Sequence, residues 1–339
     1  MTPTARRRLF RLLKIVVSAG LLTYLFLAID VSKLGPLFAR MHLGWFAAAL
    51  AVFLAARLVV AFRWAVMLSA RGVRLSVLRA LQLSFIGAFF NTFLPSSMGG
   101  DAIRALHVAR AEAGLADSFV SVALERVVGL VALVLLTSVG CLLVRDRVRG
   151  TGALLAVAVL WAGLGFAGLV FYTWGTWSGW ISRLGEGRPR LAATLGKFDS
   201  LHESVLGFRR AHRVLAAGLG LSLLYRGISV LGSLALAWSL GIHIRAVYFV
   251  VFHPIRQCIM MVPITIFGAG LREASAVFFY TQVGMSRAEA LGFGLVGGAA
   301  MLLINAVGGL VYAFSGAKRP PGAEAADRPP AGPETSSLT

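Results

Sequence analysis

The sequence predicts an all-α membrane protein, a polytopic helix bundle with two inverted-topology repeats that each contain a re-entrant broken-helix hairpin. Three observations lead to this prediction. The mean hydropathy is +0.80, with 58% hydrophobic and 14% charged residues, far from soluble averages. Several apolar stretches reach about 20 residues, enough to cross roughly 30 Å of hydrocarbon. Two similar polar cassettes, each a proline followed by glycines, interrupt these stretches in the two halves of the chain.

The charges between the apolar stretches predict how the first half crosses the membrane. The first span, about Leu9 to Ile29, follows a cluster of arginines, so the N-terminus is expected in the cytoplasm. A second span, about Gly44 to Trp64, returns to a loop that is again basic. Two short helices then surround the first cassette, and Arg79 and Arg110 flank the pair. Residues 80–112 are therefore expected to form a re-entrant hairpin that enters from the cytoplasm.

The second half is predicted to mirror the first. A second re-entrant hairpin, residues 246–284, is expected to enter from the opposite side, which gives the two halves inverted topology. An amphipathic cytoplasmic segment, residues 183–213, lies between them. The other full spans are expected at about 119–144, 152–172, 214–240 and 291–314. This scheme leaves three arginines outside, against the positive-inside bias: Arg145, Arg147 and Arg149.

These elements predict one transmembrane domain and a tail. The domain covers residues 1–316 and holds about six full spans besides the two hairpins. Residues 317–339 are rich in Pro, Ala and Gly and are expected to be a disordered tail. Lys318 and Arg319 at the root of the tail place the C-terminus in the cytoplasm as well.

The two cassettes contain the main candidate binding residues. Counting from Pro95 in the first cassette and Pro263 in the second, both have a hydroxyl at +2, a glycine at +5 and an arginine at +9. Paired Gly/Pro interruptions in corresponding halves of a membrane protein indicate a substrate site made of broken helices. The matched positions are Ser97, Gly100 and Arg104 in the first cassette and Thr265, Gly268 and Arg272 in the second.

The cassettes are expected to hold an anion. Each should begin a short helix near the bilayer midplane, where unpaired N–H groups and the positive end of the helix dipole favour phosphate or carboxylate. The two prolines serve as hinges that end the incoming helices. Arg104 and Arg272 lie about one turn into the outgoing helices, within reach of the same anion. Further candidates are glycines that permit close approach, a candidate N-cap and an adjacent acid: Gly99, Gly100, Gly268, Gly270, Asp101 and Glu273.

Other ionisable residues lie deep in the predicted spans and complete the candidate site. They are Arg57, Glu125, Arg126 and Arg226. A charge at the centre of a lipid-facing helix costs roughly 2.5–3.5 kcal/mol. Six such groups, counting Asp101, Arg104 and Arg272 but not Arg126, would cost on the order of 15–20 kcal/mol together, more than a typical folding stability. They must therefore face one another or a hydrated cavity. Internal salt bridges that only stabilise the bundle remain the alternative.

Composition argues against several other classes. The net charge of +19 would suggest nucleic acid in a soluble chain, but the arginines here lie mostly between apolar stretches. Orientation in the membrane and anionic lipid explain them better, so no nucleic-acid partner is expected. Cys141 and Cys258 each lie in an apolar stretch and provide neither a disulfide framework nor a metal-binding spacing. No metal or cofactor is expected.

The cassettes and their surroundings resemble the lysylphosphatidylglycerol synthase transmembrane region family, whose members are flippase-like. The resemblance rests on Arg63-Trp64, on the run from Phe89 to Pro95 that leads into Gly99-Gly100-Asp101 and Arg104, on Glu125-Arg126-Val127-Val128-Gly129, and on Gly268-Ala269-Gly270-Leu271-Arg272-Glu273. It covers roughly residues 10 to 315. Two differences stand out, since the family more often has Asp-Arg at 125–126 and a Gly-Gly-x-Gly run where this chain has Phe267-Gly268-Ala269-Gly270.

The resemblance implies a multi-pass protein of the bacterial inner membrane that moves lipids between leaflets. The expected partner is a membrane lipid with an anionic or zwitterionic headgroup, whose phosphate Arg104, Arg272 and the two helix starts would hold. A lipid synthase or a glycosyltransferase is a further candidate partner, and self-association is also open. The soluble aminoacyl-transferring domain of full-length synthases is not in this sequence, so lipid synthesis by this chain alone is not implied. As a transporter it would not be an enzyme.

Two other classes remain open. One is a membrane lipid-phosphate hydrolase, because undecaprenyl-pyrophosphate phosphatases also pair inverted repeats with re-entrant hairpins and Leu94-Pro95-Ser96-Ser97 is similar to one of their motifs. Hydrolysis would need a base or nucleophile beside the phosphate, and Asp101 and Glu125 are the acidic candidates in the first half. The other class is a non-transporting protein that docks a glycosyltransferase or lipid synthase through the basic segment 183–213.

Overall fold

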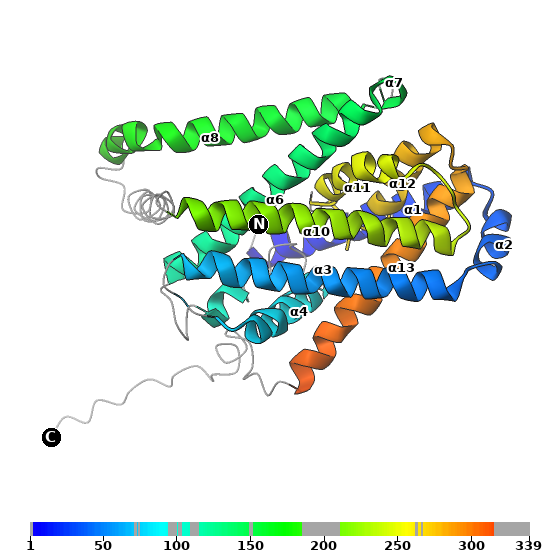
Figure 1. The fold of residues 1–339 in the computed structure, drawn as a ribbon, viewed down its shortest axis with the longest axis horizontal. Helices are drawn as coiled ribbons and strands as arrows, with labels where there is room; N and C mark the ends of the chain where they lie inside the picture. The colour runs from blue at the N-terminus through cyan, green and yellow to red at the C-terminus, as the bar shows by residue number, and fades with distance from the viewer. Residues whose placement is uncertain are drawn as a thin grey trace.

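The computed structural model describes residues 3–70, 73, 75–93, 100, 104–108, 115–148, 152–184, 211–261, 264–265 and 267–314. Within these ranges the chain is helical and has no strands, which confirms the all-α prediction (Figure 1). The helices are α1 (Pro3–Ala28), η1 (Val31–Lys33), α2 (Leu34–Ala39), α3 (Leu43–Ser69), α4 (Val77–Phe93), α6 (Leu115–Leu143), α7 (Arg145–Val148), α8 (Ala153–Leu184), α10 (His212–Ser239), α11 (Ala246–Met261), α12 (Leu271–Tyr280), η2 (Thr281–Val283) and α13 (Arg287–Phe314).

Among the described residues, four helices are long and apolar enough to cross a membrane, so the chain is a multi-pass membrane protein. They are α3, the Val120–Leu143 part of α6, α10 and α13. Two more predicted spans coincide with α1 and α8, whose described apolar stretches are shorter, at Ile15–Ala28 and Ala153–Leu169. Most of the predicted amphipathic segment 183–213 and all of the tail 317–339 lie outside the described residues, as does Arg149. Arg145 and Arg147 belong to the short helix α7.

The helices pack into a bundle around α10. Helix α3 lies along α10, α13 packs on both α4 and α12, and α6 contacts α10 and α11 (Figure 1). Helix α8 contacts the bundle mainly near its start, where Ala153 is fully buried, while Leu155 and Phe166 further along are 69% exposed. Exposed apolar side chains on the outside of such a bundle are expected where lipid tails take the place of water.

An aromatic cluster fixes the position of the second cassette. Phe249 and Phe252 of α11, Tyr280 of α12 and Phe293 of α13 are at most 3% exposed. The Tyr280 ring lies 5.2 Å from Phe249, 5.7 Å from Phe252 and 5.3 Å from Phe293, measured between centroids. The pairs with Phe252 and Phe293 are edge-to-face, and such pairs add about 0.5–1.5 kcal/mol each beyond the burial of their surface. The short helix α12 is therefore held firmly between α11 and α13.

The chain breaks its helix at the second cassette, as predicted, while most of the first cassette lies outside the described residues. Helix α4 ends at Phe93, and α11 ends at Met261 before α12 begins at Leu271. Phe267 (φ 53°), Gly268 (φ 71°) and Gly270 (φ 84°) adopt left-handed backbone conformations in this second break, which favour glycine. Five candidate residues lie outside the described residues, namely Pro95, Ser97, Gly99, Asp101 and Pro263.

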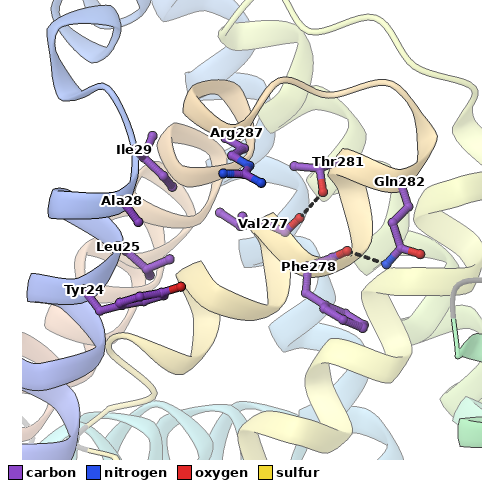
Figure 2. Close-up of a pocket in the computed structure, with 9 residues that line it drawn as sticks. All are labelled: Tyr24, Leu25, Ala28, Ile29, Val277, Phe278, Thr281, Gln282 and Arg287. Carbon is purple, nitrogen blue, oxygen red and sulfur yellow. Dashed lines mark hydrogen bonds between the residues drawn. The ribbon is translucent and has the colours of Figure 1, made fainter.

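Helix α1 crosses the N-terminal end of α12 and then continues along it. A Cβ atom on Gly270 would lie 2.7 Å from the Cβ of Leu21 and 3.1 Å from the carbonyl oxygen of Ser18, so only glycine permits this approach. Towards the other end of α12 the two helices part, and a groove of about 460 Å³ opens between them (Figure 2). The rest of this interface is closed by packing that includes Leu25, Ile29 and Leu291.

Candidate functional site

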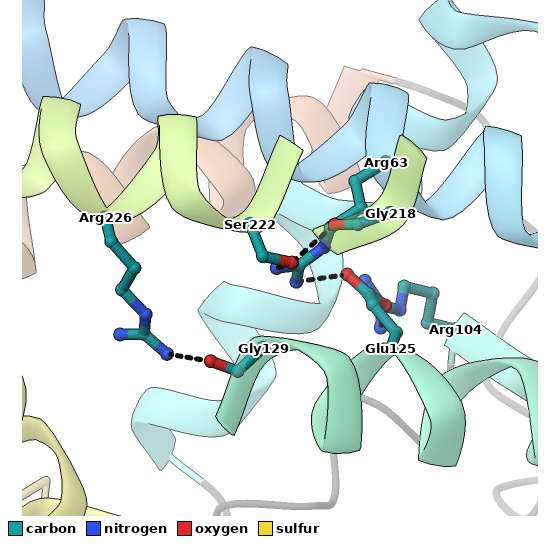
Figure 3. Close-up of polar contacts among 7 residues, drawn as sticks. All are labelled: Arg63, Arg104, Glu125, Gly129, Gly218, Ser222 and Arg226. Carbon is teal, nitrogen blue, oxygen red and sulfur yellow. Dashed lines mark hydrogen bonds and ion pairs between the residues drawn. The ribbon is translucent and has the colours of Figure 1, made fainter. Parts of the chain in front are cut away.

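The centre of the first cluster is Glu125 on α6, whose carboxylate bridges two arginines (Figure 3). Its Oε1 accepts a hydrogen bond from Arg63 Nη2 at 2.8 Å and its Oε2 accepts one from Arg104 Nη2 at 2.6 Å. Arg63 lies on α3, and Arg104 begins the helical residues 104–108 after the first cassette. All three residues are at most 7% exposed. Two ion pairs at this depth join three segments that are distant in the sequence, and both are charge-assisted hydrogen bonds.

Neighbouring side chains hold the two guanidinium groups of this cluster in place. Arg63 Nη1 donates to Ser222 Oγ at 2.8 Å, and that hydroxyl donates to the carbonyl of Gly218 one turn earlier in α10 (Figure 3). The Cζ of Arg104 lies 4.3 Å from the ring centroid of Trp64, which is fully buried. Stacking a cation on a desolvated indole contributes about 2 kcal/mol.

The first cassette reaches this cluster through a close backbone contact. The N–H of Gly100 donates to Asn91 Oδ1 of α4 at 2.7 Å. A Cβ atom on Gly100 would lie only 1.8 Å from the carbonyl oxygen of Gly87. Glycine at position 100 is therefore required for the chain to return against α4. That return brings Arg104 to Glu125.

A second feature of the same region is a group of arginines around Tyr225 of α10. The Cζ atoms of Arg226 and Arg63 lie 5.3 Å and 5.9 Å from the Tyr225 ring centroid. Arg57 of α3 is also within electrostatic range of the Tyr225 hydroxyl and of Arg104. Arg57 Nη2 donates to Asn305 Oδ1 of α13 at 2.9 Å. Four positive charges and the carboxylate of Glu125 thus meet in the middle of the bundle.

Arg226 is held at one end of a chain of hydrogen bonds. Its Nη2 donates to the carbonyl of Gly129 at 3.3 Å (Figure 3), and its Nη1 donates to Gln257 Oε1. The Gln257 amide nitrogen then donates to His253 Nε2 at 3.0 Å, because the amide oxygen already faces Arg226. His253 Nδ1 is left to donate to Ser233 Oγ at 2.8 Å. The order of donors fixes the imidazole in its neutral Nδ1–H form.

The second cluster lies at the second cassette. Arg272 Nη2 donates to the carbonyl of Phe267 at 2.6 Å, and Arg272 Nη1 lies 3.7 Å from Glu273 Oε1. The other oxygen of Glu273 accepts the N–H of Gly270 at 2.6 Å and caps the start of α12. Arg256 of α11 donates to the carbonyl of Arg272 at 3.0 Å. The anion that the helix start attracts is therefore supplied here by the chain's own carboxylate.

The structure divides the predicted site residues between these two clusters. Arg57, Arg104, Glu125 and Arg226 gather in the first, whereas Gly268, Gly270, Arg272 and Glu273 lie in the second. Arg126 is half-buried and points about 100° away from Glu125 around α6. Thr265 is buried. Among the described residues, no hydrogen bond or ion pair joins Arg104 to Arg272, so their binding of one anion stays a prediction.

Four residues that complete the clusters were not among the sequence candidates for the site. They are Arg63, Tyr225, Arg256 and Asn305. Arg256 is an arginine inside an apolar helix, so the insertion cost that singled out Arg57 would have found it. Arg63 lies at the end of the predicted span 44–64, where depth gives no such signal. Tyr225 and Asn305 carry no such signal, because their partners come from other helices.

The buried charges of the two clusters do not balance. Among the residues that the structure describes, five arginines and two glutamates are buried: Arg63, Arg104, Arg226, Arg256 and Arg272 against Glu125 and Glu273. Isolated buried charge costs several kcal/mol per ion even after relaxation. The Nε atoms of Arg63 and Arg226 are buried without a hydrogen-bond partner. Such an interior is suited to a bound anion.

Comparison with known proteins gives one match. A family model described as the lysylphosphatidylglycerol synthase TM region matches residues 11–309. No curated protein and no solved structure matches the chain.

Proposed function

We propose that this chain, which belongs to the lysylphosphatidylglycerol synthase TM region family, moves a phospholipid or lipid-linked headgroup between leaflets as a flippase or scramblase. A role connected with membrane lipid follows from the family and from the multi-pass fold. Transport is our inference. The observation that carries it is the gathering of Arg57, Arg63, Arg104 and Arg226 in the middle of the bundle, where buried arginines outnumber buried glutamates among the described residues.

The headgroup would bind at the group of arginines around Tyr225. Arg63 and Arg104 are preorganised by Glu125, and Arg226 by Gln257. Guanidinium forks suit phosphate because they donate two parallel hydrogen bonds. A phosphate there would place negative charge beside these arginines and would give the Nε atoms of Arg63 and Arg226 an acceptor. The acyl tails would stay in the surrounding lipid.

Two re-entrant hairpins with inverted topology would let the halves rock around this site. The lengths of α11 and α12 support the second hairpin, because helices of 16 and 10 residues reach only about 24 Å and 15 Å at 1.5 Å per residue. A full crossing needs about 30 Å. The two helices also pack against each other on either side of the break. Corresponding support in the first half is the backbone contact between Gly87 and Gly100.

The wider assignment follows from the same proposal. The domain would cover residues 1–316, with the second arginine cluster as a structural counterpart of the first. The protein would lie in a bacterial inner membrane with both termini in the cytoplasm, as the basic N-terminal segment and the basic root of the tail indicate. Its partner would be a lipid with an anionic or zwitterionic headgroup, and no catalytic step is assigned.

Transport can be tested in liposomes that contain fluorescent phospholipids and purified protein. A reductant added outside bleaches only the outer leaflet unless the protein exchanges lipid, so wild type is expected to raise the bleached fraction above that of protein-free liposomes. Arg104→Gln and Arg63→Gln should each slow exchange by tenfold or more, since a charge-assisted contact is worth about 1.5–3 kcal/mol. Arg245→Gln, at an exposed arginine before α11, is the matched control and should transport normally.

Each of three results would contradict the proposed transport function. Equal bleaching with and without protein, for both anionic and zwitterionic lipids, would show that the protein does not transport these lipids. Release of phosphate from a polyprenyl pyrophosphate, abolished by Asp101→Asn, would instead establish a lipid-phosphate hydrolase. Cellular function that survives the simultaneous replacement of Arg104 and Arg272 would favour a docking partner of a lipid synthase or glycosyltransferase.

A further inference from the structure

Apolar side chains line the groove between α1 and α12 along its length, while its polar side chains gather towards one end (Figure 2). Leu25, Tyr24 and Phe278 lie at one end in this view, and Arg287, Thr281 and Gln282 gather towards the other. Leu25 is 5% exposed and belongs to the packed floor, whereas Tyr24 and Phe278 are 67% and 59% exposed and form the walls. Its volume of about 460 Å³ falls within the roughly 300–1,000 Å³ of small-molecule pockets.

Arg287 is the free charge of this groove. It is the first residue of α13 and is exposed, and no described residue forms an ion pair or hydrogen bond with its guanidinium. The other polar side chains already have partners, because Thr281 Oγ1 donates to the carbonyl of Val277 at 2.6 Å and Gln282 Nε2 donates to the carbonyl of Phe278 at 2.5 Å. The nearby carboxylate of Glu289 accepts the N–H of Ser286 at 2.7 Å.

We infer that this groove binds a single anionic phospholipid, with one acyl chain between α1 and α12 and the phosphate at Arg287. The two ends of the groove match the two ends of such a molecule in polarity and in charge. In the predicted orientation α1 ends and α13 begins at the outer face, which places Arg287 at that interface.

The site is separate from the arginine cluster proposed for transport. Helix α2 packs with the floor of the groove through Leu34, and α3 begins just after α2 at Leu43. Arg63 lies about 30 Å further along α3, at 1.5 Å per residue. The inference does not depend on transport, because a lipid can reside here whether or not the protein exchanges lipids.

Native mass spectrometry of the full chain in detergent tests the inference with phosphatidylglycerol and phosphatidylcholine of identical acyl chains. Wild type is expected to retain one phosphatidylglycerol at least fivefold more tightly than phosphatidylcholine, and Arg287→Gln to remove this preference. Arg245→Gln, an exposed arginine just before α11, should keep it. Ala28→Trp places an indole in the groove and should lower retention of both lipids by about fivefold or more.

The outcomes separate this inference from the proposed function. Equal retention of the two lipids by wild type, or an unchanged preference in Arg287→Gln, would overturn it. A dimer in wild type that Ala28→Trp dissociates would show that a second copy fills the groove instead. Because Arg104→Gln changes neither the groove nor Arg287, it should slow lipid exchange and leave this preference intact.

Discussion

The two arginine–glutamate clusters use the same residue types in different ways. Glu125 receives its partners from two other parts of the chain, Arg63 at 2.8 Å and Arg104 at 2.6 Å. Glu273 follows Arg272 directly, lies 3.7 Å from it and uses its other oxygen to cap its own helix. The first carboxylate therefore fixes segments against one another, while the second stabilises one turn. A buried carboxylate stabilises the tertiary structure when its partners come from segments that are distant in the sequence.

The largest effect is expected from Glu125→Gln. The glutamine keeps the shape, but its amide nitrogen must face one of two guanidinium groups, and both ion pairs of Glu125 are lost. Breaking a buried pair costs about 3–5 kcal/mol. Thermal unfolding of the purified protein in detergent should show the loss as a large fall in Tm. Asp30→Asn, at an exposed pair with Lys33, should leave Tm unchanged. A small change in Glu125→Gln would mean that the bridge does not hold the segments together.

A smaller loss of stability is expected when a methyl group is added next to Arg272 in the second cluster. A Cβ atom on Gly298 of α13 would lie 2.2 Å from Arg272 Nη1, so Gly298→Ala must displace a guanidinium that is already bonded to Phe267 and Glu273. Overpacking of this kind costs about 2 kcal/mol. The adjacent Gly297→Ala is the control, because its methyl would meet only Leu236 Cδ2 at 3.5 Å, an ordinary contact. Equal Tm values for the two variants would contradict the assigned position of Arg272.

Glu273→Gln tests the comparison most directly. Glutamine can still accept the N–H of Gly270, and Arg272 keeps its bond to the carbonyl of Phe267. Only the 3.7 Å pair is lost, so we expect a cost of about 1 kcal/mol. The fall in Tm should be less than half of that for Glu125→Gln in the same detergent. If the two falls are alike, Glu273 neutralises Arg272 as strongly as Glu125 neutralises its own partners.

Much of the fold could be predicted from the sequence because hydropathy and loop charge act locally. Apolar length placed α3, α6, α10 and α13, and proline and glycine placed the break after α11. Hydropathy also indicated that the arginines deep in the predicted spans need polar or charged partners. It could not say which partners, because the pairs Arg63–Glu125 and Arg57–Asn305 join helices whose contact is decided by packing.

The part of the site that sequence reasoning could not reach is the difference between the cassettes. Because Arg104 and Arg272 occupy the same position in the two cassettes, the sequence predicted the same anion-binding role for both. In the structure Arg104 stacks on Trp64 and pairs with a distant carboxylate, while Arg272 folds back on its own turn. That distinction depends on Glu273, whose position beside Gly270 lets it cap α12. Spacing alone does not reveal whether a carboxylate will pair with an arginine or with a backbone N–H.

The smallest effect is expected from Phe267→Leu. The Cζ of Arg272 lies 5.0 Å from the Phe267 ring centroid, but the residue is only half-buried, so the cation–π contact is worth about 0.5 kcal/mol. Arg272 also binds the backbone carbonyl of Phe267, which the substitution preserves. Tm should therefore change hardly more than in Phe166→Leu, an exposed control on α8. A large fall would show that Arg272, like Arg104 on Trp64, depends on an aromatic side chain, and the contrast between the clusters would narrow.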